Sequence, residues 1–243
     1  LTANCPEVPS DRRLPKVTAP GDLTSFDVFS LGVHHVHGRQ TKVMGFHDHF
    51  SKLNFVVLLN DETSDEIERG IREYAAHAHS HKVTLRWLHT DNAKAHLTSN
   101  VVRLVRDELK CRYTTIAPHN PRGNGAMERQ WRTMGNDTRA LLNSSHLPRN
   151  FAWYALRHSV DVRNTLPFDE DPEQCARRMF TGSRPPAAHF RVFGCVVYAK
   201  VYNRITKMSN QAIACIHLGN APGGYLCVEP TRRKVFVGAH CRF

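Results

Sequence analysis

The chain has 243 residues, of which 41% are hydrophobic, and this is enough for one large domain or a domain with a small appendage. Lys and Arg outnumber Asp and Glu by 33 to 22, and the formal charge of +11 favours a polyanionic partner such as nucleic acid. No apolar run approaches the roughly 18 residues of a membrane-spanning helix, so we expect no membrane partner. Seven scattered cysteines without a C-x-x-C pair argue against a disulfide framework and predict an intracellular, reducing compartment.

Polar residues and four prolines fill residues 1–22, which is typical of an extended arm. Because the chain begins at Leu1, we expect it to be a piece of a longer or processed protein. Apolar periodicity and turn residues then predict, in chain order, strands at 23–29, 43–48 and 54–59, a helix at 61–79, a strand at 83–91, a helix at 99–110 and a strand at 111–116.

A loop rich in proline and glycine follows and leads into a helix that carries Glu128 near its start. Met127, Trp131, Met134 and Thr138 recur at steps of three and four residues, which predicts one apolar face. A carboxylate in the first turn is favoured by the helix dipole, and this is also a reasonable position for a metal-binding acid beside bound phosphate. An ordinary solvated glutamate is the alternative interpretation.

The C-terminal third contains a predicted helix at about 150–164, then a charged segment with several prolines, and finally a series of short β-like runs. We expect residues 168–188 to be a linker and residues 189–243 to form a small β-rich domain.

Three acids stand at strand ends or at a helix start in this α/β pattern, namely Asp27, Asp91 and Glu128. In a mixed sheet such positions meet near one edge. Two divalent cations held there could clamp the attacking and leaving oxygens of a phosphoryl displacement, and Mg²⁺ prefers carboxylate oxygens. The basic surface would hold the polyanion on which these ions act.

Several runs of residues resemble the integrases of copia-type retrotransposons. The run around the third acid is Asn124-Gly125-Ala126-Met127-Glu128-Arg129-x-x-Arg132-Thr133, with Thr115-x-Ala117-Pro118 before it and Arg139-x-Leu141-Leu142 after it. Similar runs elsewhere are Asp48-x-Phe50-Ser51-Lys52, Asp91-Asn92, Leu147-Pro148-x-x-Phe151, Arg163-Asn164-x-Leu166-Pro167 and His189-Phe190-Arg191-Val192-Phe193-Gly194-Cys195. The likeness runs in one register from about residue 23 to residue 243.

This resemblance implies a ribonuclease-H-like α/β fold, with a mixed five-stranded sheet flanked by helices at 23–167 and a small β-rich region after it. It implies that Asp27, Asp91 and Glu128 bind Mg²⁺ or Mn²⁺ and catalyse 3′-end processing and strand transfer of DNA. The residues expected to contact nucleic acid are Arg122, Asn124, Arg129, Arg132 and Arg139. An oligomer or a larger complex is also expected.

The chain departs from the family after the second acid, where Ala93-Lys94-Ala95-His96 replaces two glycines and an acid. Loss of glycines that permit close backbone approach could disturb metal or DNA placement. Two functions therefore stay open. The chain is an active integrase of the nucleus, or it is a domesticated, inactive fold that binds DNA or RNA in a large ribonucleoprotein such as a ribosome, for which an organelle is a further location.

The 16 histidines add alternative sites. His47 and His49 flank Asp48 close to the first acid, which suggests a supporting role there. The alternating His77, His79 and His81 close a predicted helix, and we expect them to be exposed. We expect no zinc site, because Cys215, His217, Cys227, His240 and Cys241 lack C-x-x-C spacing.

Overall fold

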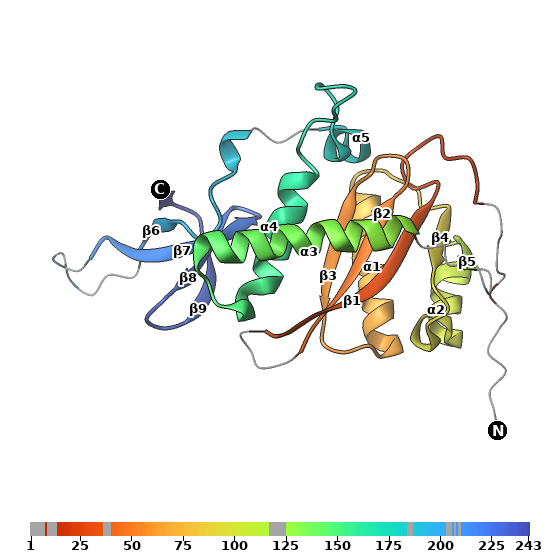
Figure 1. The fold of residues 1–243 in the computed structure, drawn as a ribbon, viewed down its shortest axis with the longest axis horizontal. Helices are drawn as coiled ribbons and strands as arrows, with labels where there is room; N and C mark the ends of the chain where they lie inside the picture. The colour runs from red at the N-terminus through yellow and green to blue at the C-terminus, as the bar shows by residue number, and fades with distance from the viewer. Residues whose placement is uncertain are drawn as a thin grey trace.

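The computed structural model describes residues 8, 14–35, 40–116, 125–183, 187–202, 206, 208 and 210–243. Figure 1 shows two sheets joined by helices, with the larger sheet on the right and the C-terminus in the smaller one on the left. No helix in the described ranges has the length and apolar character needed to cross a membrane.

The larger sheet is mixed and five-stranded, as predicted. Its strands are β1 (Thr24–His34), β2 (Gln40–Asp48), β3 (Asn54–Leu59), β4 (Trp87–Thr90) and β5 (Arg112–Thr115), in the order β3-β2-β1-β4-β5. β1, β2 and β3 form an antiparallel meander, whereas β4 and β5 run parallel to β1. The helix α1 (Ser64–Ser80) carries the chain from β3, at one edge, to β4, which lies on the far side of β1.

Helices cover both faces of this sheet (Figure 1). One face packs against α1, α2 (Ser99–Arg103) and a π-helical turn at Leu104–Glu108, through a core that includes Phe26, Phe46 and Tyr74. The other face packs against α3 (Gly125–Ser145) and α4 (Ala152–Arg163), which follows a 3-10 turn at Arg149–Phe151. The described elements differ from expectation mainly in length, since β1 extends five residues beyond 29 and β4 is confined to Trp87–Thr90.

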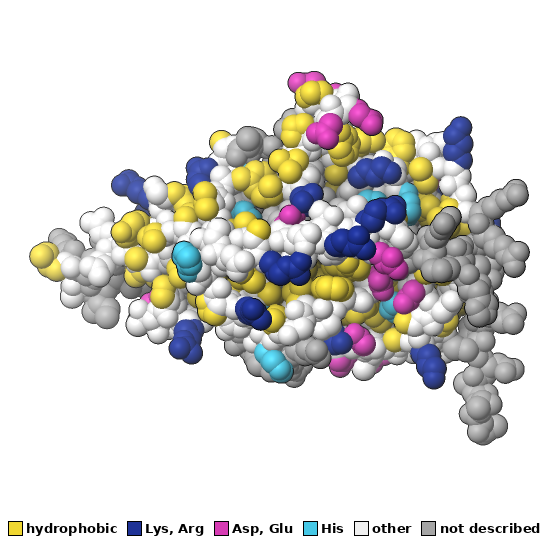
Figure 2. All heavy atoms as spheres, viewed as in Figure 1, with side chains coloured by type: hydrophobic (Ala, Val, Ile, Leu, Met, Phe, Trp, Pro, Cys, Tyr) yellow, Lys and Arg dark blue, Asp and Glu magenta, His cyan; other side chains and the backbone are white. Residues whose placement is uncertain are grey.

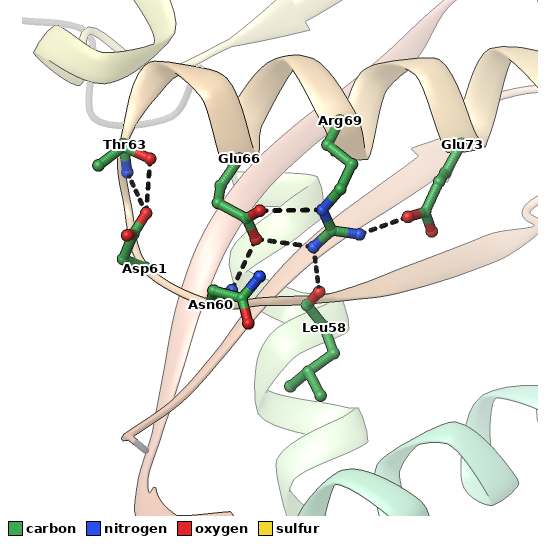
Figure 3. Close-up of polar contacts among 7 residues, drawn as sticks. All are labelled: Leu58, Asn60, Asp61, Thr63, Glu66, Arg69 and Glu73. Carbon is green, nitrogen blue, oxygen red and sulfur yellow. Dashed lines mark hydrogen bonds and ion pairs between the residues drawn. The ribbon is translucent and has the colours of Figure 1, made fainter.

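The outer edge of β3 is held by side chains at both ends. Figure 3 shows the Arg69 guanidinium of α1, which donates to the Leu58 carbonyl oxygen at 2.6 Å while it pairs with Glu66 and Glu73. At the other end, the Asn164 amide accepts from the Asn54 N–H at 3.0 Å and donates to the Asn54 carbonyl at 2.7 Å. Asn164 thus bonds to β3 as a neighbouring strand would.

The segment expected to be a linker contains the helix α5 (Ala176–Thr181), followed after a gap by a 3-10 turn at Ala187–His189. The Phe180 side chain is 3% exposed and packs against Tyr74 and His77 of α1. This segment therefore contributes to the core of the larger sheet.

The smaller sheet is antiparallel, with β6 (Val196–Lys200), β7 (Ala212–Ala221), β8 (Gly224–Glu229), β9 (Lys234–Gly238) and β10 (Cys241–Arg242) in the order β10-β6-β7-β8-β9. Because β9 and β10 lie at opposite ends of this order and only two residues separate them in the chain, the sheet curls until its edges meet. Its residues Leu218 and Val228 pack with Phe193 against Leu142 and Ala155, so the smaller sheet packs against helices α3 and α4, which cover the larger one.

Candidate active site

Asp27 lies on the β1 face that α3 covers. Its neighbour Phe26 points into the α1 core, and side chains alternate along a strand. Asp27 pairs across the ladder with Gly45 of β2, and the Trp131 ring of α3 lies directly over this glycine. A methyl group at Gly45 would stand 2.5 Å from the Trp131 ring, which also stacks on Phe29 at 5.0 Å. Small size at Gly45 therefore lets α3 approach the strand that carries Asp27.

Asp91 comes directly after β4 and stands beside Asp27. In the parallel β1–β4 ladder Ser25 is opposite His89, and two residues further along each strand are the two acids. Burial raises the pKa of Asp27 to about 6, and the charge of Asp91 adds to this increase. The structure thus brings two of the three expected acids close enough for their charges to interact.

A buried histidine holds Asp91. Burial alone would raise the pKa of Asp91, but hydrogen bonds from His96 at 2.8 Å and from the Ala93 N–H at 3.1 Å lower it below its usual value of 3.8. His96 is 2% exposed, its Nδ1 also lies 2.9 Å from the Thr90 hydroxyl, and its carbonyl accepts from the Tyr113 hydroxyl at 2.7 Å. This contact was not predicted, because it depends on the 3-10 turn Lys94–Leu97 that brings His96 back onto Asp91.

Glu128 lies in the first turn of α3 with an exposed side chain. Trp131, one turn later on this helix, lies near the Asp27 carboxylate and acts to lower its pKa, but its Nε1 forms no hydrogen bond with the described residues. Within the described residues no three His, Cys, Asp or Glu side chains are grouped closely enough to hold a metal ion, so Glu128 does not join the acid pair in this arrangement.

The basic residues expected to contact nucleic acid divide into two groups. Arg122 and Asn124 lie outside the described residues. Arg129, Arg132 and Arg139 are exposed on α3, and Figure 2 shows Lys and Arg side chains, in dark blue, gathered along this helix. A positive surface therefore extends away from the acid pair.

Histidines of the β2–β3 turn support the same sheet face. The His49 Nε2 lies 2.8 Å from the Ser25 hydroxyl, and burial together with His47 lowers the pKa of His49 to about 4. The His47 Nδ1 lies 3.0 Å from the Asn54 amide oxygen. The expectation of exposure is wrong for His77, which stacks on Phe55 at 4.7 Å.

No family model matches the chain. In sequence, the chain is 29% identical over 127 residues to the Retrovirus-related Pol polyprotein from transposon TNT 1-94 of Nicotiana tabacum. This match covers 51% of the chain and 10% of the polyprotein, so the chain corresponds to a small part of that relative.

Solved structures of retroviral integrases have similar folds. A chain of the simian T-cell lymphotropic virus intasome, in complex with the PP2A regulatory subunit B56 gamma, matches with a TM-score of 0.58 and 18% identity, over 98% of this chain and 84% of that one. The catalytic core of BIV integrase matches with a TM-score of 0.50 and 18% identity, over 66% of this chain and 93% of that one. The HTLV-2 integrase catalytic core in complex with magnesium matches with a TM-score of 0.51 and 17% identity, over 68% of this chain and 99% of that one. The larger sheet and its helices therefore have the fold of retroviral integrase catalytic cores, in a chain whose sequence resembles part of a retrotransposon Pol polyprotein.

Proposed function

We propose that the chain is a polynucleotidyl transferase that processes and joins DNA ends, with Asp27, Asp91 and Glu128 as its catalytic acids. The observation that supports this proposal is the adjacent pair of carboxylates, because burial and then the charge of Asp91 make ionisation of Asp27 unfavourable. A bound cation would relieve this cost. Carboxylate pairs of this kind are typical of functional sites.

The donor chemistry of the acid pair fits Mg²⁺ or Mn²⁺, which take oxygen ligands. Asp27 and Asp91 would hold the ion, and Glu128 on the helix above them would complete the ligand set. When bound, the ion supplies Lewis-acid stabilisation of charge on a phosphoryl oxygen. His96 positions Asp91 through its hydrogen bond at 2.8 Å, and Trp131 packs beside Asp27.

The exposed arginines of α3 supply the surface for the substrate. Arg129, Arg132 and Arg139 project from the helix that begins beside the acids. Guanidinium groups bind phosphate oxygens in a bidentate manner, so this surface would orient a DNA backbone toward the acid pair. The HTLV-2 core is described in dimeric and trimeric forms, and we propose that this chain also assembles into an oligomer in the nucleus.

Strand transfer with labelled DNA ends and Mn²⁺ tests this function. We expect joined products with the wild-type chain and a loss to background with Glu128→Gln or Asp27→Asn. Glu170→Gln, which alters an exposed acid of the segment before α5, should retain full activity. If wild type and Glu128→Gln give the same background signal, the catalytic function is refuted.

A second function, binding without catalysis, is favoured by the position of Glu128. In the described residues Glu128 stands apart from the acid pair, so Asp27 and Asp91 are not joined by a third carboxylate. The chain would then bind RNA or DNA as a structural subunit of a ribonucleoprotein. An organelle is a further location for such a complex. Salt-sensitive binding of RNA that is indifferent to Mn²⁺ and to Asp27→Asn would support it, and Mn²⁺-dependent strand transfer would exclude it.

A further inference from the structure

We propose that a cleft at the β3 edge of the larger sheet, separate from the acid pair, binds a nucleotide, either free or as the end of a nucleic-acid strand. The cleft lies between α4, α5, the edge of β3 and the turn between β7 and β8. It has a volume of about 770 Å³, and a pocket of about 170 Å³ adjoins it. The two share Phe55, His77, Arg157, Asp161 and Arg177. This is ample for a mononucleotide, since small-molecule sites span roughly 300–1,000 Å³.

The charge of the cleft favours an anion. Arg157 and Arg177 both face Asp161, yet among the described residues neither forms an ion pair with it within 4.0 Å. Burial raises the pKa of Asp161, which disfavours its charged form, so this acid offsets the two guanidiniums only in part. A phosphate group would accept hydrogen bonds from both arginines, and planar guanidiniums suit phosphate geometry.

The walls of the cleft favour a flat ring beside that anion. His77 is stacked between Phe55, at 4.7 Å, and Phe180, at 5.8 Å, so its two faces are covered and it presents its edge to the cleft. Phe190 and Tyr225 line the cleft from the C-terminal side. Aromatic side chains such as Phe190 and Tyr225 can stack on nucleobases.

The two parts of the lining together separate a nucleotide from other anions. An acidic peptide would satisfy the arginines but would leave the aromatic walls unexplained, so a nucleotide accounts for more of the cleft.

The cleft is distinct from the candidate catalytic centre. It lies against β3, at one edge of the sheet, while the acid pair lies between β1 and β4. Binding in the cleft therefore needs neither a divalent ion nor strand transfer. If the catalytic function fails, strand transfer is absent while AMP still binds in EDTA. If the cleft proposal fails, AMP does not bind, whatever the result of strand transfer.

Titration calorimetry of the full chain with AMP, inorganic phosphate and an acidic hexapeptide, in EDTA, tests the proposal. We expect saturable binding of AMP, weaker binding of phosphate, and a loss of at least about tenfold in AMP affinity with Arg177→Gln, because a charge-assisted hydrogen bond contributes roughly 1.5–3 kcal/mol. Arg103→Gln, which alters an exposed arginine of α2 outside both the cleft lining and the candidate catalytic centre, should leave AMP affinity unchanged. Phe190→Leu should weaken AMP binding but not phosphate binding.

Competition identifies the source of the nucleotide. If a short oligonucleotide with a 5′-phosphate displaces AMP more effectively than the same strand without it, a strand end is the occupant. If neither strand displaces AMP, a free nucleotide is the occupant, and both results support the site. Absence of AMP binding, equal affinity of wild type and Arg177→Gln, or tighter binding of the acidic peptide than of AMP would overturn the proposal.

Discussion

Replacing Asp27 by Asn removes a carboxylate whose pKa is raised from 3.8 to about 6, chiefly by burial and then by the charge of Asp91. Each pH unit of displacement corresponds to about 1.4 kcal/mol, so ionised Asp27 is up to about 3 kcal/mol less favourable in the folded protein than in the unfolded chain. The asparagine oxygen can still accept the Val28 N–H, as the carboxylate does at 2.8 Å. The substitution thus removes charge and keeps shape.

The sign of the effect follows from proton linkage. Below pH 3.8 the carboxyl group is protonated in both states and contributes no difference. Between pH 3.8 and about 6 the unfolded chain ionises first, so the wild-type protein loses stability as the pH rises, and the loss is complete above pH 6. We expect Asp27→Asn to escape this loss and to exceed wild type by up to about 3 kcal/mol at neutral pH.

Urea unfolding in EDTA at a series of pH values from about 3.5 to 7.5 measures this difference, because the other titrating groups are common to both proteins. The difference in free energy of unfolding between Asp27→Asn and wild type should be near zero at about pH 3.5. Saturating Mn²⁺ should then stabilise wild type but not Asp27→Asn, since a ligand that binds only the folded state adds to its stability. A difference that stays constant across the pH range would refute the reasoning about the acid pair.

Three further outcomes follow from packing and charge. Gly45→Ala should destabilise the protein by about 1–3 kcal/mol in urea unfolding, because the new methyl group stands 2.5 Å from the Trp131 ring, and an unchanged midpoint would contradict this contact. Phe180→Ala should cost about 3–5 kcal/mol in the same assay, whereas a cost below about 1 kcal/mol would show that α5 is not part of the cooperative core. Arg132→Gln should weaken DNA binding equally across sequences and reduce the slope of log affinity against log salt by about 0.9 in fluorescence anisotropy, and an unchanged slope would exclude a phosphate contact.

The larger sheet could be predicted because its signals are local. The β-prone runs that became β2 and β3, and the apolar stripe of Met127, Trp131 and Met134, each depend on neighbours within a few residues. The closure of the C-terminal sheet was not predicted, since the pairing of Cys241 with Ala199 joins residues far apart in sequence. Local patterns do not report such contacts.

The candidate site was predicted only in part for the same reason. Asp27 and Asp91 could be named from their places at strands, and the structure places them side by side. The hydrogen bond from His96 to Asp91 depends on the path of a short 3-10 turn, Lys94–Leu97, which the residue pattern did not indicate. Likewise, α5 was predicted as a linker because charged residues and prolines surround the single buried ring of Phe180.

The two side chains that hold the edge of β3 have a consequence for how copies of this chain meet. An open strand edge is a template on which another strand can add, and repeated addition leads to fibrous aggregates. Asn164 and Arg69 occupy the backbone groups of Asn54 and Leu58 at either end, so an incoming strand would have to displace both before it could pair. A basic protein that gathers on a polyanion reaches high local concentrations, and these two residues would let it do so without polymerising through its sheet.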